Sequence, residues 1–307
     1  AAGVATRELD RPVHHVEPRV ERRRVLETTH VGLPVVLHRP CASLGHIDGP
    51  GTRIALLETW REASRRAFDG ELTGHRMIDQ VMADAARNGV SWYHIETRLQ
   101  GVHDELLHHR PTDYASLRRH HWNVTGSIGA WLIERAGVRD PVVIDRAHEL
   151  GHAMQLTNLV VDVGDDLERG RLQLPDEVLS AHGLSEEQLA EVRADDRAPL
   201  PEGFIAALEL LMQKADRAYA ISLEAAAALP GTLARAVIVA ARIYQGHHDA
   251  LRNVAHDSLR QRVHLDRLDK VALAAAALSE LARMDRTRLR LARRAVARPV
   301  PELVAQP

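Results

Sequence analysis

The segment QLTNLVVDVGDDLERGRLQLP, from Gln155 to Pro175, indicates both the fold class and the place of the functional site. Asn158, Asp162 and Asp166 follow one another at i, i+4 and i+8, so a helix carries all three on one face. Four residues of helix rise about 6 Å, and carboxylates at that separation cannot face a core without a neutralising cation. Oxygen ligands of this kind suit Mg²⁺. The spacing therefore predicts a magnesium site.

Arginines directly after the aspartates place fixed positive charge beside the predicted metal site. Arg169 and Arg171 follow in the stretch ERGR, and a guanidinium group can hold phosphate oxygens through paired N–H donors. Magnesium and arginine around one pocket predict a polyphosphate substrate. The alternative is a solvated acidic helix end. The apolar run before Asp162 is instead typical of a buried helix, and the polar residues Gln155 and Asn158 within that run favour a functional site.

Helical periodicity extends over most of the chain. From about Gly51 onward apolar residues recur every three or four positions, and the alternation typical of strands is nearly absent. The expected helices are 52–68, 74–88, 91–108, 113–135, 140–167, 202–228, 231–256 and 265–295. Breaks are expected at Gly137, Pro175, Pro199, Pro201 and Pro230-Gly231. This pattern predicts one all-α domain over 51–295, preceded by an irregular N-terminal arm over 1–50 and followed by a frayed tail over 296–307.

Charge and cysteine content narrow the class of protein. The chain has 40 Lys and Arg against 42 Asp and Glu, so its net charge of −2 gives no reason to expect a nucleic-acid partner. A single cysteine, Cys41, cannot form an internal disulfide, which suits a reducing compartment. No run of 18 apolar residues and no secretory signal pattern is present in the sequence. The expected location is the cytoplasm.

The segment from Gln155 to Pro175 closely resembles the second aspartate-rich motif of squalene and phytoene synthases, Q-L-x-N-[IL]-x-x-D-V-x-[ED]-D followed by R-G-R-[IL]-Y-[LF]-P. Further segments are similar in the same order along the chain. They are Asp104 in GVHDEL, HHWNVTGSIG at 120–129, ARIYQGH at 241–247 and RVHLDRLDK at 262–270. The resemblance covers about 52–285, and four ordered matches make coincidence improbable.

This resemblance implies an isoprenoid-synthase-type helical bundle around a central apolar cavity. It implies Mg²⁺-dependent, head-to-head condensation of two farnesyl or geranylgeranyl diphosphates to a squalene- or phytoene-type product, with NADPH needed only for squalene-type chemistry. The metal residues would be Asn158, Asp162 and Asp166. The catalytic residues would be Asp162, Asp166 and Tyr244, and the substrate-binding residues Gln155, Arg171, Arg262, Lys270 and His120. Because the product is a hydrocarbon, peripheral contact with the inner face of the membrane is expected, and the oligomeric state stays open.

Departures from the family pattern leave the level of activity open. No D-D-x-x-D motif precedes Gly51, where the family carries its first aspartate-rich motif. His120 and Gln173 stand where the family has tyrosine, and Val161 stands where arginine is frequent. Two interpretations follow: an enzyme with impaired turnover, or a non-catalytic relative that serves as an assembly or scaffolding protein.

Two other activities remain as less favoured alternatives. The pentapeptide HELGH, from His148 to His152, has the H-E-x-x-H spacing of zinc hydrolases, in which two histidines bind the metal and the glutamate acts as base. Gln155 and Asn158 stand where the metzincin extension requires glycine and histidine. A class I terpene cyclase uses a similar Asn/Asp metal helix on a single prenyl diphosphate.

Overall fold

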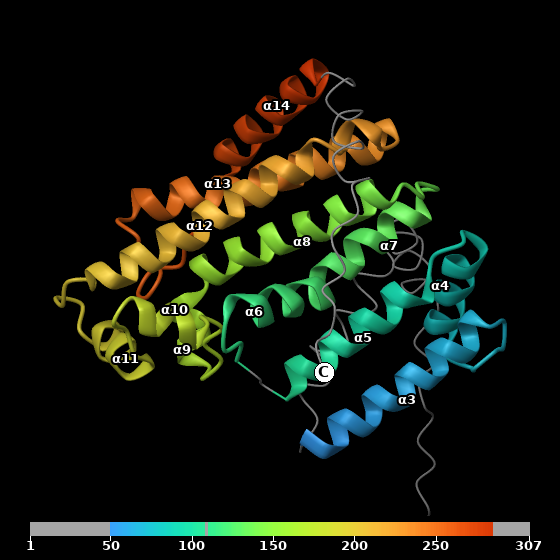
Figure 1. Ribbon diagram of the computed structural model, residues 1–307, viewed down its shortest axis with the longest axis horizontal. Coiled ribbons are helices and arrows are strands. Elements are labelled where there is room, and N and C mark those ends of the chain that lie inside the picture. Colours follow the sequence, from blue (N-terminus) through green and yellow to red (C-terminus); the bar gives the residue numbers. More distant parts are fainter. Residues whose placement is uncertain (1–49, 108–109, 285–307) are drawn as a thin grey trace, which may run out of the picture.

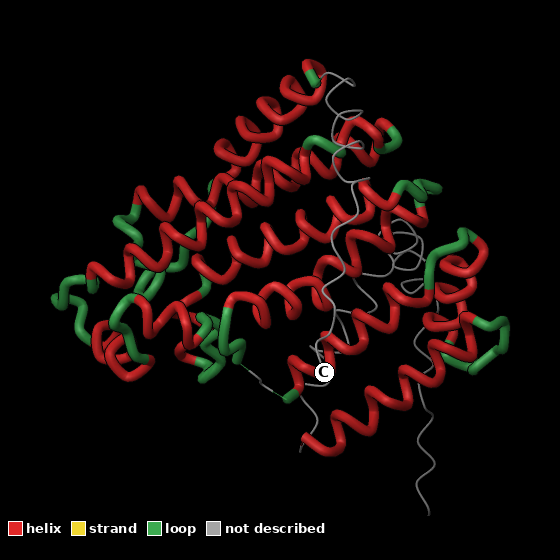
Figure 2. The backbone as a smooth tube through the Cα atoms, in the orientation of Figure 1, coloured by secondary structure: helices red, strands yellow, loops and turns green. Residues whose placement is uncertain are grey.

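The computed structural model describes residues 50–107 and 110–284, and every regular element in these ranges is a helix (Figures 1 and 2). The described residues contain no strand, so the all-α prediction is confirmed. The predicted arm, apart from Pro50, and the predicted tail over 296–307 lie outside the described residues.

The helices run in the following order. They are α3 (Pro50–Phe68), α4 (Arg76–Arg87), α5 (Trp92–Leu106), α6 (Tyr114–His121), the π-helix η1 (Trp122–Gly126), α7 (Ser127–Arg135), α8 (Pro141–Val161), α9 (Val163–Glu168), α10 (Asp176–Ala181), α11 (Glu186–Ala194), α12 (Glu202–Leu223), the 3-10 helix η2 (Ala226–Ala228), α13 (Gly231–Asn253) and α14 (Arg267–Arg283).

Side-chain caps explain where several predicted helices begin. The Asp113 carboxylate accepts a hydrogen bond from the Ser116 amide at 2.7 Å at the start of α6. Asp140 caps α8 in the same way, with Pro141 at the first helical position, and Asp266 caps α14. These acceptors satisfy amides that have no partner within the first helical turn.

Two short helices, α10 and α11, occupy the stretch between Pro175 and Pro199 where no helix was expected. The hydroxyl of Ser185 accepts a hydrogen bond from the Gln188 amide at 3.1 Å, which starts α11. Leu189 then anchors α11 in the main core. The sequence S-x-x-Q at 185–188 is a helix-start signal. Each of the two helices is too short, however, for a helical repeat of apolar residues to be visible in the sequence.

Helix α8 lies in the middle of the bundle, with α12, α7, η1 and α13 packed around it (Figure 1). Every residue from Val142 to Val161 is buried or partly buried, as expected of an enclosed helix. The largest apolar cluster forms where α8 meets α12, and Leu156, Phe204 and Leu208 there are fully buried. The helix that carries the polar motif is thus the central element of the fold.

Glycines let α8 cross η1 and α7 at close range. A Cβ atom on Gly151 would lie 2.7 Å from the Gly126 nitrogen, and one on Gly129 would lie 3.0 Å from the Ala147 carbonyl oxygen. The first contact is too short for any side chain and the second is tighter than side chains usually accept, so the backbone of α8 lies very close to those of η1 and α7. This crossing brings η1 and the start of α7 against the same side of α8 as Gln155.

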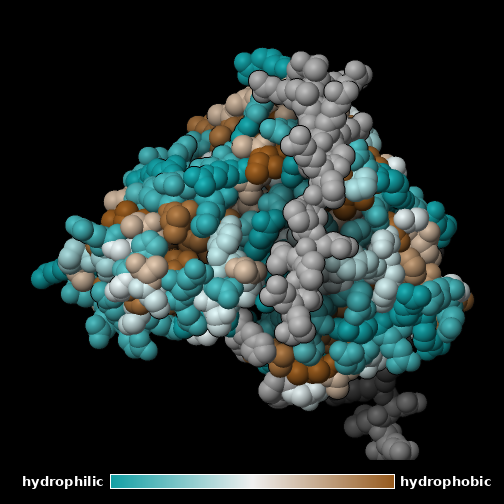
Figure 3. All heavy atoms as spheres, viewed as in Figure 1, coloured by the Kyte–Doolittle hydropathy of each residue, from teal (hydrophilic) through white to brown (hydrophobic). Residues whose placement is uncertain are grey.

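The exposed surface is mainly polar. On the face seen in Figure 3, hydrophilic residues cover most of the described surface and hydrophobic residues form small, separate patches. Among the helices within 50–107 and 110–284, none combines the length and the apolar character needed to cross a membrane.

Candidate functional site

A cavity of about 510 Å³ opens where α5, α6 and η1 face the end of α8 and the start of α9. It brings together six of the site residues predicted from the sequence: His120, Gln155, Asn158, Asp162, Asp166 and Arg171. The other lining residues are Arg53, Arg98, Asp104, Glu105, Leu106, His121, Val124, Thr125, Ile128, Leu159 and Gln173. The polar motif therefore faces a cavity.

The three oxygen-bearing residues are presented by a helix that breaks at Asp162, which differs from the single helix expected over 140–167. The Asp162 amide still donates to the Asn158 carbonyl, and the Asp166 amide to the Asp162 carbonyl, each at 2.9 Å. The amide of Gly164 makes no intrahelical hydrogen bond and instead donates to the Ser258 carbonyl at 3.0 Å. The loop after α13 thus divides α8 from α9 and leaves the three residues lining one cavity.

Burial raises the pKa of both aspartates. The pKa of Asp166 rises to about 6, first because the carboxyl group is desolvated and then because Asp162 is close. Desolvation also raises the pKa of Asp162, with a further contribution from Asp165. Two partly buried carboxylates that repel one another are stabilised by a cation between them. Two carboxylates and the Asn158 amide oxygen form a donor set that fits Mg²⁺, which leaves its other positions to water and phosphate.

Three predicted residues around the cavity lie in different settings. Arg171 is exposed at the cavity edge, and its amide donates to the Asp166 carbonyl at 2.8 Å. The Gln155 side-chain amide donates to the hydroxyl of Thr125, which ties α8 to η1. His120 has its pKa lowered by burial, although Glu105 and Asp104 oppose that effect. His120 thus faces acidic residues of α5.

Three other predicted site residues do not line this cavity. Tyr244 is half-buried on α13 and packs against the main apolar cluster. Arg262 is exposed in the loop before α14, and its positive charge acts to lower the pKa of Asp162. Lys270 is exposed in the first turn of α14. Their roles in catalysis and substrate binding remain predictions.

The α5 wall of the cavity adds Arg98 and Glu105, which the sequence interpretation did not select. Arg98 lies three residues after Ile95 and four before Val102, on the apolar stripe that anchors α5 in its core cluster. An arginine at a core position of an amphipathic helix is a signal visible in sequence. It was missed because no motif surrounds it.

A second, apolar cavity of about 320 Å³ shares Thr125 and Ile128 with the polar cavity. Its walls come from α7, α8, the end of α12, η2 and α13. The other lining residues are Gly129, Leu132, Ile133, Val143, Arg146, Ala147, Leu150, Gly151, Met154, Ser222, Ala225, Ala226, Leu229, Leu233, Ala236, Val237 and Ala240. A polar cavity beside an apolar cavity suits an amphiphilic substrate. The expected central apolar cavity is confirmed.

Comparison with known proteins decides the family. The profile of the squalene/phytoene synthase family matches residues 5–269. The chain belongs to the squalene/phytoene synthase family. This confirms the resemblance drawn from the motifs. The matched range includes most of the 1–50 segment, in which no family motif was recognised.

Relatives in this family carry the name phytoene synthase. The protein from Thermus thermophilus is 33% identical over 238 residues, which cover 74% of this chain and 75% of that protein. The protein from Pseudescherichia vulneris is 28% identical over 237 residues, covering 77% and 74%. The protein from Cereibacter sphaeroides is 32% identical over 177 residues, covering 57% and 48%. The chain thus aligns with about half of this last relative's length and three quarters of the other two.

Solved structures show the same fold. A dehydrosqualene synthase in complex with a ligand superposes with a TM-score of 0.65 at 22% identity, covering 80% of this chain and 85% of that chain. The squalene synthase HpnC from Alicyclobacillus acidocaldarius gives a TM-score of 0.65 at 20% identity, covering 72% and 81%. These likenesses establish the fold of the family member described here.

The HELGH histidines of this family member are engaged in packing. The ring of His148 stacks on Trp122 with 3.5 Å between ring centroids. His152 contacts the Tyr114 hydroxyl at 2.8 Å and His121 Nδ1 at 2.9 Å, while Glu149 pairs with Arg118. Across 50–107 and 110–284, no group of three His, Cys, Asp or Glu side chains could hold a metal ion. In this structure the motif joins α8 to α6 and η1.

These buried histidines predict a stability that falls with acid. Burial lowers the pKa of His148 to about 3 and that of His152 to about 4. An unfolded chain protonates histidine near pH 6.5, so the folded state is most stable above that value and loses about 1.4 kcal/mol per pH unit and histidine below it. We expect His148→Phe, which keeps an aromatic ring on Trp122, to make the urea midpoint less dependent on pH between 7 and 5. An unchanged slope would contradict the assignment.

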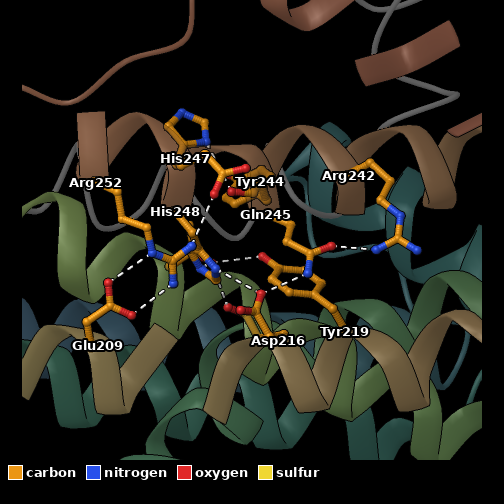
Figure 4. A network of polar contacts seen from close by, with 12 residues as sticks. Glu209, Asp216, Tyr219, Arg242, Tyr244, Gln245, His247, His248 and Arg252 are labelled. Carbon is orange, nitrogen blue, oxygen red and sulfur yellow. Dashed lines mark hydrogen bonds and ion pairs between the residues drawn. The ribbon is translucent and has the colours of Figure 1, made fainter. Parts of the chain in front are cut away.

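A buried polar network between α12 and α13 orients α8 (Figure 4). His248 bonds the Asp216 carboxylate through Nδ1 and the Thr157 hydroxyl through Nε2, both at 2.9 Å. The hydroxyls of Tyr219 and Thr157 are 3.0 Å apart. Adjacent residues of a helix project about 100° apart. Holding Thr157 against α12 and α13 therefore fixes the rotation of α8 that turns Asn158 toward the cavity.

Proposed function

We propose that this family member joins two prenyl diphosphates head to head into a phytoene- or squalene-type product. One observation carries the proposal: the cavity with Asn158, Asp162 and Asp166 adjoins the apolar cavity at Thr125 and Ile128. A diphosphate fits the polar part and a prenyl chain fits the apolar part. Membership of the family and the names of the relatives support the same reaction.

The aspartates would hold Mg²⁺ together with the Asn158 side chain. When bound, Mg²⁺ would supply Lewis-acid neutralisation of a departing diphosphate, which is otherwise a poor leaving group. Arg171, at the cavity edge, donates N–H groups to phosphate oxygens. The hydrogen bond from Gln155 to Thr125 fixes the position of Thr125, which lines both the polar and the apolar cavity.

The apolar cavity protects the carbocation that forms when the allylic diphosphate leaves. The aliphatic side chains of Ile128, Leu150 and Leu233 line it without offering a nucleophile, and water excluded from the cavity cannot capture the cation. Few aromatic faces contribute, since the chain has only 2 Phe, 4 Trp and 4 Tyr residues. Shielding here thus depends on aliphatic side chains.

Geranylgeranyl diphosphate is the substrate we propose, because the curated relatives are named phytoene synthases. The test is incubation with Mg²⁺ and either geranylgeranyl or farnesyl diphosphate, with and without NADPH, followed by product analysis. We expect a phytoene-type hydrocarbon from geranylgeranyl diphosphate and no need for NADPH. A cyclic product from one diphosphate would instead indicate a terpene cyclase. No diphosphate release from either substrate would indicate the non-catalytic relative.

Leu150 is a position at which the accepted chain length can be tested. It lines the apolar cavity eight residues before Asn158 on α8, or about 12 Å along the helix axis. In Leu150→Trp the indole fills space that the far isoprene units need. We expect kcat/KM for geranylgeranyl diphosphate to fall at least about tenfold relative to farnesyl diphosphate, since each buried CH₂ contributes about 0.8 kcal/mol. The control is Leu210→Trp on the exposed face of α12, and equal losses for both substrates would contradict the assignment.

A further inference from the structure

The guanidinium group of Arg98 is buried in the wall of the polar cavity without the partners that such a group needs. Arg98 is 2% exposed and belongs to α5. Among the described residues, Nε and Nη1 have no hydrogen-bond acceptor. The carboxylate of Glu105 lies 3.7 Å from Nη1, which is an ion-pair distance and too long for a hydrogen bond.

This arrangement is costly for the free protein. A buried charge is tolerated when it is paired and its donors are satisfied, and Glu105 provides only part of the charge balance. Its side chain is 32% exposed, so water weakens the pair further. The neighbouring buried residues Ile95 and Leu99 are aliphatic. An aliphatic side chain would therefore pack at this position without the cost of a buried charge, so packing alone does not explain an arginine here.

The position of Arg98 indicates which ligand would satisfy it. The same cavity holds Asp162 and Asp166 on α8 and α9, whereas Arg98 comes from α5. A head-to-head reaction brings two diphosphates into one cavity, and one metal-binding wall accounts for the first of them. Arginine in a low-dielectric wall binds phosphate oxygens through its paired donors.

Acidic neighbours on α5 do not block an anion at Arg98. The Asp104 carboxylate accepts a hydrogen bond from Gln100 at 2.9 Å and lies 3.8 Å from His103. Glu105 is the carboxylate that faces the guanidinium, and its negative charge also acts on His120. Glu105 balances the charge of Arg98, but at 3.7 Å it accepts no hydrogen bond from Nη1, so the buried donors stay unpaired.

We propose that Arg98 binds the diphosphate group of the second prenyl substrate on the α5 wall, across from the aspartates. This inference rests on the proposed function for the identity of the anion. The burial of Arg98 and its unpaired donors do not depend on the proposed function. Arg98 acts as a binding residue, and Glu105 acts through Arg98 as a positioning residue.

Inorganic pyrophosphate is the probe that tests the proposal. Calorimetric titration of the full chain, in Mg²⁺ and separately in EDTA, compares wild type with Arg98→Met and with the control Arg87→Met. Arg87 is an exposed arginine of α4 away from the cavity. We expect Arg98→Met to bind pyrophosphate at least tenfold more weakly under both conditions, and Arg87→Met to bind as wild type does.

Thermal unfolding without ligand separates binding from a structural role. Replacing a buried, poorly paired charge by methionine should leave the melting temperature unchanged or raise it. Arg98→Lys keeps the charge with one ammonium group and should bind pyrophosphate with intermediate affinity. A melting temperature that falls in Arg98→Met, together with wild-type pyrophosphate affinity in Arg98→Lys, would overturn the proposal.

Failure of this inference is distinguishable from failure of the proposed function. If Asp162→Asn abolishes turnover while Arg98→Met keeps wild-type KM and pyrophosphate affinity, the synthase assignment stands and the role of Arg98 is refuted. If the wild type turns over neither prenyl diphosphate but loses pyrophosphate affinity in Arg98→Met, the anion site stands without the reaction.

Discussion

Replacing Asp162 with asparagine is expected to lower turnover of prenyl diphosphates at least about a hundredfold, the factor associated with loss of one preorganised contact to developing charge. Asp162 lies four residues after Asn158 and four before Asp166, and all three residues line the cavity. Asparagine keeps the size of the side chain but removes half of the charge that would hold the cation. The measurement is release of diphosphate from geranylgeranyl diphosphate against Mg²⁺ concentration.

Stability should not follow activity in this variant. Desolvation and the neighbouring carboxylate raise the pKa of Asp166 to about 6. Removing the charge of Asp162 relieves that repulsion, so the metal-free protein should unfold at the same or a higher urea concentration. Functional sites often show this opposition between stability and activity.

Asp165→Asn is the matched control. Asp165 lies next to Asp166 but outside the cavity lining, and it pairs with Arg169 at 3.7 Å. We expect its turnover to stay close to that of the wild type. Wild-type turnover in Asp162→Asn, or equal losses in the two variants, would refute the role given to Asp162.

Replacing Gly164 with alanine is expected to destabilise the fold by about 1–3 kcal/mol, the usual cost of forcing extra atoms into a packed site. A Cβ atom there would lie 2.2 Å from the Leu259 carbonyl oxygen and 2.7 Å from that of Ser258. Both are backbone atoms of the loop after α13, and Arg193 bonds the Leu259 carbonyl as well. The loop would have to move away, and the bond from the Gly164 amide to Ser258 would be lost.

Urea unfolding followed by circular dichroism measures this effect. The control is Gly51→Ala in α3, where a Cβ atom meets nothing within 4 Å and alanine should be neutral or stabilising. An unfolding midpoint of Gly164→Ala equal to that of wild type would mean that residues 258–259 do not press against the α8–α9 break.

Much of the fold could be predicted from local sequence. Pro141, Pro201 and Gly231 stand at helix starts, and the long helices α12 and α13 begin where the proline and glycine breaks placed them. Helix α11 was not expected, because nine residues contain too few apolar positions for a period to be visible. The division of α8 from α9 was also not expected, since its cause lies in a loop about a hundred residues away.

The candidate site also contains residues that the sequence predicted and residues that only the structure revealed. The i, i+4, i+8 spacing of Asn158, Asp162 and Asp166 indicated a shared face from sequence, and the three residues line one cavity although the helix breaks at Asp162. Arg98 belongs to no motif; its core position on α5 could be read from the sequence, but only the structure showed that α5 lines the same cavity. For Tyr244 and Lys270 the prediction came from resemblance, and the structure places both outside this cavity.

By itself, the sequence determined the helical class and the family, and it indicated three polar residues that line one cavity, because each depends on spacing along a continuous segment. Only the tertiary structure decided the break at Asp162, the α5 wall with Arg98 and the junction of the polar and apolar cavities at Thr125 and Ile128. These features depend on how closely helices approach one another. That approach is set by side-chain packing between residues far apart in the chain, which spacing along the sequence does not encode.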